Sequence, residues 1–286
     1  MNCDFNLPLL PLAVFLGVFG LLSNIHAAEG TSEAFNYGNY AEVLKTYVDD
    51  NGMVNYKELK ANRENLNMFV TDIGALNPGT YAQWNDSEKI AFLINTYNAL
   101  TLKLIIDHYP IKSSFFKSLI WPKNSIRQIS GAWDKITFKV MGNDMTLDHI
   151  EHEILRKEFN EPRIHMAIVC ASKGCAQLAN KPYTGDELIN QLDHNTNLFF
   201  KNPEKFRIDR DKNTVRLSPY FKWFGKDFIK TYGTDERFAE HSETERAALN
   251  FIGNYLTGAD QEYLATTKYG IRYLHYDWSL NEQKKD

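Results

Sequence analysis

The sequence predicts an α+β fold: a helix-rich single domain with a small, mostly antiparallel sheet built from hairpins. Helical patterns outnumber strand patterns along the chain. The strand patterns mostly come in pairs across short turns, which favours α+β over an alternating α/β arrangement. Aromatic residues make up 13 % of the sequence, enough for a well-packed core rather than a disordered chain.

One helix and its neighbours carry most of this prediction. The strongest helical pattern runs from Ser87 to His108, with Asp86 or Ser87 as its N-cap and Pro110 as its stop. Its apolar residues cover nearly the whole circumference, which indicates a central buried helix. The expected helices are residues 33–48, 56–76, 87–108, 148–159, 185–200, 219–232 and 236–256. The expected strands are 135–140 with 145–147 across a Gly142-Asn143 turn, a buried strand 163–170, 206–208 with 214–217, and 269–276.

Residues 1–27 are expected to be a signal peptide. From Leu7 to Leu22 almost every residue is apolar, but this run is short for a bilayer-spanning helix, which needs roughly 20 residues. Ala27 supplies a small residue where a signal peptidase cuts. Because no Lys or Arg precedes the apolar run, an uncleaved membrane anchor stays the alternative. Residues 28–286 are then one exported domain, periplasmic or extracellular, with no further transmembrane segment.

The charge distribution argues against a nucleic-acid-binding protein. The formal net charge is −4, and the Lys and Arg residues are scattered among acidic ones. A nucleic-acid binder carries a basic patch or stripe instead. We therefore expect no nucleic-acid partner; the sequence indicates no cofactor and does not identify any other partner.

Two asparagines on the central helix are unusual for so apolar a segment. Asn95 and Asn98 lie three residues apart and so neighbour each other on the helix surface. Buried amides must be hydrogen-bonded or they cost stability. They either brace neighbouring loops, which is the commoner case, or line a pocket and orient a histidine.

The segment from His165 to Cys175 (HMAIVCASKGC) has the clearest candidate chemistry. A predicted strand delivers Cys170 into a turn of small residues, a place where functional groups are often found. Cys170 is a candidate nucleophile, with Lys173 and nearby imidazoles favouring its thiolate. Export leaves Cys170 and Cys175 as a pair in an oxidising compartment, so a structural disulfide across Gly174 is the alternative.

Three histidines are candidate acid–base groups. His149 and His152 lie three apart on a predicted helix and share a face, and His165 follows on the predicted strand. Their spacing matches no zinc signature, so no metal is expected. The alternative to acid–base chemistry is that these histidines are partly exposed on the surface or hydrogen-bonded in the core. If the strand is regular, His165 and Cys170 point to opposite faces of it. A histidine of the helix is then the better base for Cys170.

Five blocks of the chain carry a family likeness, in order: Tyr47–Leu59, Ala91–Ile105, Leu147–Arg156, Pro162–Leu178 and Tyr273–Asn281. They resemble the family of domains of unknown function 547. The resemblance implies membership but no activity, because that family has no established one. Ala176 stands where members typically have Pro after the second cysteine. The matching polar positions are Asn95, Asn98, Glu151, His165, Cys170, Ser172 and Cys175.

These observations predict an exported protein with a candidate thiol-dependent hydrolase or acyltransferase site. Cys170 attacks, a histidine is the base, and an asparagine orients it or binds the oxyanion. The alternative is a non-catalytic binding or scaffolding module with a structural Cys170–Cys175 disulfide. The candidate catalytic residues are Cys170, His149, His152, His165 and Asn95, and the candidate binding residues are Asn98, Glu151 and Ser172.

The signal peptide makes a first testable prediction. Protein from the exported fraction should have lost residues 1–27, because the apolar run ends at a cleavable small residue. Intact-mass measurement checks this. A membrane-bound species that retains Met1 to Ala27 would instead support the anchor.

Overall fold

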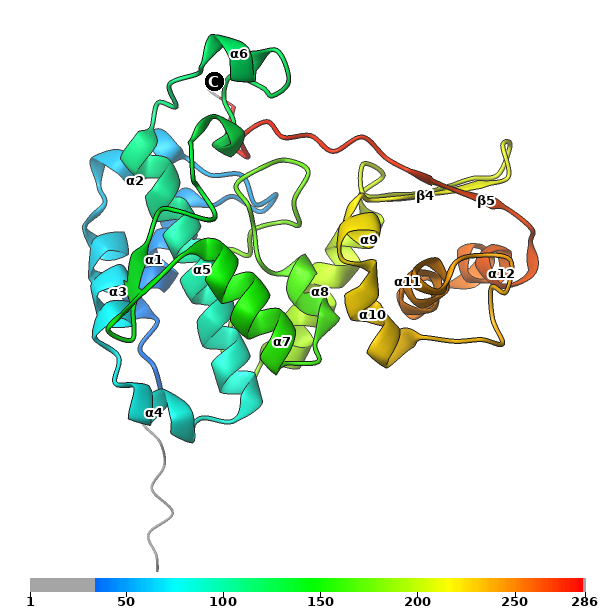
Figure 1. Cartoon of the computed structure of the whole chain (residues 1–286), viewed down its shortest axis with the longest axis horizontal. Helices are drawn as coiled ribbons and strands as arrows, with labels where there is room; N and C mark the ends of the chain where they lie inside the picture. The colour runs from blue at the N-terminus through cyan, green and yellow to red at the C-terminus, as the bar shows by residue number, and fades with distance from the viewer. Residues whose placement is uncertain (1–33, 285–286) are drawn as a thin grey trace, which may run out of the picture. The chain divides into compact units, whose positions relative to one another are not determined.

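Helix α5 (Asp86–His108) is the central element of the fold (Figure 1). In the computed structural model, which describes residues 34–284, every residue of α5 from Ile90 to Leu102 is buried. Asn85 caps the helix, and its capping box with Glu88 places the start one residue before the predicted range. By length and composition α5 is the one described helix able to cross a membrane, but 89 % of its apolar window is buried inside the protein. The predicted signal peptide, residues 1–27, lies outside the described residues.

The N-terminal helices pack around one side of α5. Phe69 of α3 stacks on Tyr40 of α1, with ring centroids 4.7 Å apart, and the ring of Trp84 lies 5.4 Å from that of Phe92 on α5. The helix predicted over 33–48 is confirmed as α1, and the helix predicted over 56–76 is confirmed with a break that divides it into α2 and α3. Helix α4 was not predicted. Their bounds are α1 (Gly38–Tyr47), α2 (Tyr56–Ala61), α3 (Glu64–Ala75) and α4 (Pro78–Gln83).

A hairpin and a π-helix follow α5. In the hairpin, Met141 and Gly142 have φ of 51° and 77°, so the turn lies one residue before the predicted Gly142-Asn143. The predicted helix 148–159 is helical, but its first part has π geometry, which is frequent at functional sites. The elements of this stretch are α6 (Phe115–Ser118), η1 (Ile126–Gln128), β1 (Phe138–Val140), β2 (Asn143–Met145), η2 (His149–Leu155) and α7 (Arg156–Glu158).

The predicted strand 163–170 is wrong. Pro162–Met166 is a 3₁₀ helix (η3), and residues 167–187 form no helix or extended strand. The segment is buried as predicted, since Ile164 and Met166 to Val169 are all inaccessible or nearly so. An apolar run marks burial without distinguishing a strand from other buried structure. Within residues 34–284 no neighbouring strand pairs with this run; its first N–H groups bond to nearby carbonyls, and side chains satisfy part of the remaining backbone.

Three buried asparagines supply those hydrogen bonds. The Asn98 amide donates to the carbonyl of Ala167 at 2.9 Å and accepts from the N–H of Val169 at 2.8 Å. Asn95 makes the same pair of bonds with the backbone of Tyr183, at 2.7 and 2.9 Å. Asn195 on α8 (Leu188–Lys201) donates to the carbonyls of Met166 and Gln177, both at 3.0 Å. The asparagines of α5 thus brace a loop, one of the two predicted roles.

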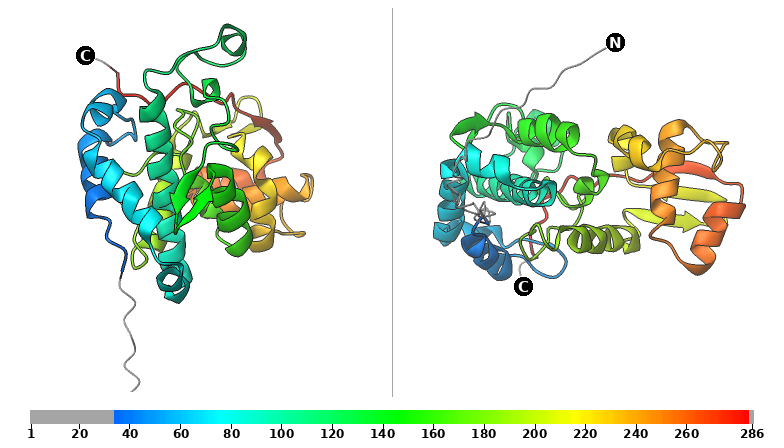
Figure 2. Two further views of the ribbon diagram at one scale, coloured as in Figure 1. Left: turned by 60° about the vertical axis from the view of Figure 1, so that its left-hand side comes forward. Right: turned by 90° about the horizontal axis from the view of Figure 1, so that it is seen from below.

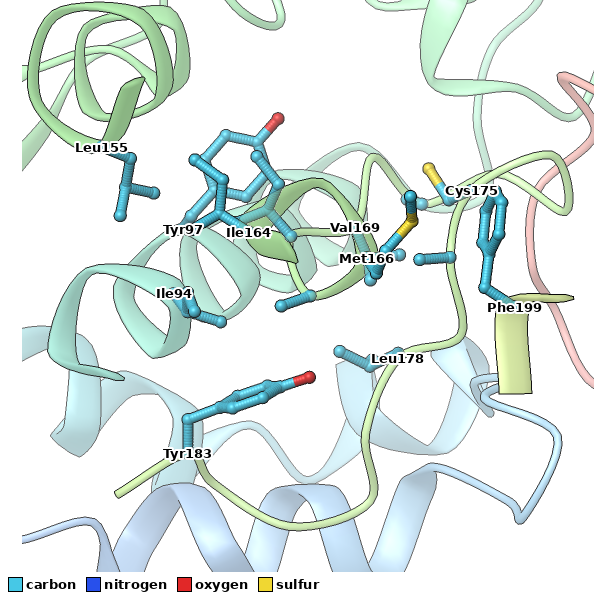
Figure 3. Close-up of a cluster of buried hydrophobic side chains, with 14 of the residues drawn as sticks. Ile94, Tyr97, Leu155, Ile164, Met166, Val169, Cys175, Leu178, Tyr183 and Phe199 are labelled. Carbon is cyan, nitrogen blue, oxygen red and sulfur yellow. The ribbon is translucent and has the colours of Figure 1, made fainter. Parts of the chain in front are cut away.

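Apolar side chains fill the space between α5 and this segment. Figure 3 shows them packed in one cluster, with the sulfur of Cys175 at one edge. Burying such side chains contributes roughly 1.5–3 kcal/mol each. The labelled members of the cluster are Ile94, Tyr97, Leu155, Ile164, Met166, Val169, Cys175, Leu178, Tyr183 and Phe199.

The C-terminal half combines helices with a three-stranded sheet. Strand β4 pairs antiparallel with β3, as predicted, and parallel with β5, which no hairpin joins to it. The α+β prediction is confirmed, while the predicted helix 236–256 begins only at Glu243 and α12 was not predicted. The elements are α8 (Leu188–Lys201), β3 (Phe206–Asp209), β4 (Thr214–Leu217), α9 (Tyr220–Trp223), α10 (Gly225–Tyr232), α11 (Glu243–Gly253), α12 (Gly258–Thr266) and β5 (Gly270–Tyr273).

After β5 the chain runs back towards the N-terminal helices, as the red trace in Figure 1 shows. Leu280 forms a bridge with Ser172, and the N–H of Val54 donates to the carbonyl of Asn281 at 2.8 Å. The side chain of Asn281 is buried and accepts from the hydroxyl of Tyr56 at 2.6 Å. This C-terminal segment, residues 274–283, therefore ties together parts of the protein that are distant in sequence.

Replacing Asn98 with Leu should destabilise the fold by about 2–4 kcal/mol, because the carbonyl of Ala167 and the N–H of Val169 both lose their partner. Urea unfolding checks this. Asn190→Leu, at an exposed position on α8, is the matched control and should change stability by less than about 0.5 kcal/mol. An unfolding midpoint for Asn98→Leu that matches the wild type would contradict the bracing role.

Candidate functional site

Cys170 opens onto a cavity of about 280 Å³ between the π-helix, α9 and the C-terminal segment. Three other predicted site residues line the same cavity, namely Glu151, His152 and His165. Most of the remaining wall is aromatic, which suits a pocket that binds a small organic group. The aromatic lining residues are Tyr97, Trp133, Tyr220, Trp223, Phe224, Tyr276 and Trp278.

Cys170 and Cys175 form a disulfide, with their Cα atoms 6.2 Å apart. Cys175 is 2 % exposed, whereas Cys170 is partly exposed at the cavity. Three donors surround the Cys175 sulfur: the N–H of Cys170 at 2.9 Å, the Tyr276 hydroxyl at 3.2 Å and the Ser172 hydroxyl at 3.4 Å. The same two hydroxyls lie 3.2 Å (Ser172) and 3.1 Å (Tyr276) from the Cys170 sulfur, so both sulfurs have hydrogen-bonding neighbours but only Cys170 reaches the cavity.

The C-terminal segment holds the turn between the two cysteines. The N–H groups of Lys173 and Gly174 donate to the carbonyls of Ser279 and Asp277 at 2.9 and 2.7 Å. Gly174 packs directly on the ring of Tyr276, where an added Cβ would lie only 2.7 Å from the ring atoms. Only glycine fits at this position without moving the ring.

Ala171, inside the same turn, has φ of 55° and is buried. This left-handed conformation costs a residue with a Cβ roughly 1–2 kcal/mol. Its carbonyl accepts from the N–H of Asn281 at 3.2 Å, so the C-terminal segment holds this residue too. Strain of this kind is concentrated at functional sites.

His165 is buried and held in one orientation. Its Nε2 lies 2.8 Å from a carboxylate oxygen of Asp227, and its ring stacks on Phe224 with centroids 4.1 Å apart. Among the described residues its Nδ1 has no hydrogen-bond partner. Burial lowers the pKa of His165, although the hydrogen bond to Asp227 opposes that shift. The imidazole is therefore neutral near pH 7, with Nε2–H donated to Asp227 and the lone pair on Nδ1.

Asp227 stays charged beside it. Arg156 donates to both oxygens of this carboxylate, at 2.6 and 2.9 Å. Burial raises the pKa of Asp227, but the hydrogen bonds from His165 and Arg156 outweigh it and hold the pKa below its usual range. A charge-assisted bidentate pair of this kind fixes the geometry of the carboxylate, and through it that of the imidazole.

Glu151 is the second group able to carry a proton in the cavity. Burial raises its pKa to about 7, against the opposing effects of a hydrogen bond from Tyr97 and the charge of Arg156. A carboxyl with a pKa near the ambient pH is suited to proton transfer. Glu151 comes from the π-helix, directly beside His152, whose Nδ1 lies 3.9 Å from it.

The other predicted residues are placed as follows. His149 is exposed and does not line the cavity. Asn95 and Asn98 lie outside it as well, with both ends of each amide bonded to the backbone. Because residues 162–166 are helical, the expectation that His165 and Cys170 point to opposite faces of a strand does not hold, and both line one cavity. Within residues 34–284, no three His, Cys, Asp or Glu side chains converge as metal ligands.

Sequence reasoning missed three residues of the site. Tyr276, whose hydroxyl lies 3.1 Å from the sulfur of Cys170, falls in a block that resembles the family, and that was an available signal. Asp227 had no such signal, since it lies far along the chain on an ordinary amphipathic helix. Arg127 lines the cavity with its guanidinium 4.2 Å from the ring centroid of Trp121 and 5.0 Å from that of Trp278.

The raised pKa of Glu151 predicts how stability depends on pH. The folded state binds this proton more tightly than the unfolded state, so the stabilisation is present below the unfolded value of 4.5 and is lost as pH rises through about 7. Relative to Glu151→Gln, the wild type should lose about 3 kcal/mol over this window. Urea unfolding of both proteins across the window measures the difference. A pH-independent difference would mean that Glu151 titrates normally.

The segment that carries most of this site is also the segment that matches a known family. Residues 81–200, from α4 to α8, match the family model described as protein of unknown function, DUF547. The match includes Glu151, His165 and Cys170, but neither Asp227 nor Tyr276. No curated protein and no solved structure matches the chain. The predicted resemblance is confirmed for this part of the chain: residues 81–200 match the family of proteins of unknown function DUF547.

Proposed function

We propose that this protein is an exported cysteine-dependent hydrolase or acyltransferase, with Cys170 as the nucleophile once its disulfide is reduced. The observation that carries the proposal is that Cys170 shares its cavity with His165, a neutral imidazole oriented by a carboxylate. A nucleophile, a base and a group that orients the base are the usual parts of covalent acyl transfer.

The reaction begins with the opening of the disulfide. A dithiol reductant gives two electrons and two protons to Cys170–Cys175 and becomes a disulfide itself. The thiolate of Cys170 then attacks the carbonyl carbon of an ester, thioester or amide, and the bond to the leaving group breaks as that group takes up a proton. Water or another nucleophile cleaves the acyl-enzyme and regenerates the thiol.

Each neighbouring group has a task in this scheme. In the disulfide form His165 Nδ1 has no hydrogen-bond partner among the described residues; after reduction the Cys170 thiol moves to Nδ1 and gives up its proton there, while Asp227 stabilises the imidazolium that forms. The Tyr276 hydroxyl, beside the sulfur of Cys170, donates a hydrogen bond to the developing oxyanion. Glu151, with a pKa of about 7, protonates the leaving group.

The cavity wall also indicates what the acyl donor carries. The guanidinium of Arg127 lies over the rings of Trp121 and Trp278 and makes no ion pair within residues 34–284. Stacking covers the faces of the guanidinium and leaves its N–H groups pointing outwards in its plane. An acyl donor with an acidic group and a flat apolar part suits this wall.

Cys175→Ser should make Cys170 permanently reduced and reactive. We expect this variant to react with iodoacetamide at neutral pH at least about tenfold faster than a model thiol, because the imidazole favours the thiolate. It should also release a burst of nitrophenolate from 4-nitrophenyl acetate, equal to the enzyme concentration, as the acyl-enzyme forms. Quench-labelling kinetics and stopped-flow absorbance measure the two.

Two controls accompany this experiment. The double variant Cys170→Ser, Cys175→Ser should give neither reaction, and His165→Asn in the Cys175→Ser background should slow both while the protein stays folded by circular dichroism. If Cys170 in Cys175→Ser labels no faster than a model thiol and gives no burst, the enzymatic proposal is wrong.

A second candidate function has its own support. Cys175 is 2 % exposed and the disulfide is closed, which also suits a non-catalytic binding or scaffolding module. In that case the disulfide braces the turn, and opening it should lower stability by about 2 kcal/mol without producing a reactive thiol. The labelling experiment above separates the two candidates.

A further inference from the structure

The loop around α6 exposes more apolar surface than any other part of residues 34–284. Phe115, Phe116, Leu119 and Ile120 are 74, 77, 71 and 73 % exposed, whereas the next large apolar side chain, Ile189, is 52 % exposed. Figure 1 and the left view of Figure 2 show α6 projecting from the helices around α5. Contiguous exposed apolar side chains of this kind mark an interaction surface.

The same loop is positively charged. From Pro110 to Ser130 the sequence contains no Asp or Glu and four cations, Lys112, Lys117, Lys123 and Arg127, in a chain whose net charge is −4. Lys112 and Lys123 flank the apolar tip and are exposed. A loop with exposed apolar side chains, flanking lysines and no acidic residue is complementary to a surface that has an apolar interior and an anionic boundary.

The tip is held in place rather than frayed. Lys117 donates to the carbonyl of Gln128 at 3.2 Å and to the hydroxyl of Ser130 at 2.9 Å. The buried amide of Gln128 accepts from the N–H of Ser114 at 3.0 Å and donates to the carbonyl of Pro122 at 3.1 Å. These hydrogen bonds order the loop while its apolar side chains stay exposed to solvent. The loop does not need to pack its apolar side chains against the rest of the protein to be ordered.

We propose that this loop, residues 112–123, docks the protein on an anionic lipid bilayer. The four apolar side chains enter the boundary between headgroups and acyl chains, and Lys112 and Lys123 contact the anionic headgroups. Interfacial segments combine these two features, large apolar residues on one side and Lys or Arg beside them. A projecting tip favours a bilayer over a protein partner, because lipids deform around it whereas a protein would need a matching groove.

The loop is also continuous with the candidate site. The ring of Trp121 at its end lies 5.7 Å from that of Trp278 in the cavity wall, and the Arg127 guanidinium lies beside both rings. Docking would therefore hold the cavity wall next to the bound surface. The docking itself does not depend on whether Cys170 is catalytic.

Co-sedimentation of residues 28–286 with lipid vesicles tests the proposal. We expect binding to vesicles of equal parts phosphatidylglycerol and phosphatidylcholine, and at least about tenfold weaker binding to phosphatidylcholine alone. Lys112→Gln and Lys123→Gln should each weaken binding to the anionic vesicles by about fivefold, the effect of one cation near such a surface. Brominated lipids should quench the fluorescence of Trp121 in a protein whose other tryptophans are replaced by Phe.

The decisive variant replaces Phe115, Phe116, Leu119 and Ile120 together with Ser. It should lose at least about tenfold in vesicle affinity with an unchanged melting temperature, because these side chains are exposed. The matched control, Met68→Ser with Ile189→Ser, removes exposed apolar side chains elsewhere and should bind as the wild type does. Equal binding by the four-residue variant would overturn the proposal. So would a wild type that ignores anionic vesicles and forms a dimer which this variant abolishes, because the surface would then join two copies of the chain.

Discussion

Segment 167–187 has to satisfy its buried backbone without a helix or a strand, and the arrangement of the site depends on how it does so. A buried peptide group without a partner costs about 1–3 kcal/mol. Asn95 and Asn98 meet this demand from α5, and Asn195 meets it from α8, each with an amide that pairs with main-chain groups. The three side chains take the place of the strand ladder that the segment lacks, and they fix its path between two helices.

This path brings the chemical groups together. A regular strand would direct alternate side chains to opposite faces, which would have separated His165 from Cys170. The 3₁₀ helix at Pro162–Met166 and the irregular stretch after it remove that alternation, so both residues line one cavity. The turn that follows then needs support from outside, and the C-terminal segment gives it through backbone hydrogen bonds and the ring of Tyr276 against Gly174.

At this site the groups that carry a fixed charge and the groups that can transfer a proton are different residues. Burial favours the neutral forms of His165 and Glu151, whereas Arg156 keeps Asp227 ionised through a bidentate pair. A fixed charge that orients a neutral base is the usual basis of acid–base function in a low-dielectric site. Aromatic rings form most of the cavity wall, and Trp121 of the loop around α6 continues that wall through its contact with Trp278.

The sequence by itself determined the fold class, the central helix and its inward-facing asparagines, the hairpins, and the position of the cysteine turn. These features follow from local periodicity, capping and turn residues, which the chain expresses over a few neighbouring positions. The block Tyr273–Asn281 resembles the family but lies outside the matched residues 81–200, and nothing in the sequence indicated its contact with Cys170. Only the tertiary structure decided that 163–170 is not a strand, that Asp227 orients His165, and that the Tyr276 hydroxyl contacts the disulfide. Whether an apolar run becomes a strand depends on a neighbouring strand with which it can pair. Contacts between residues 62 and 101 positions apart depend on how the whole chain packs. Neither dependence leaves a periodic pattern in the sequence.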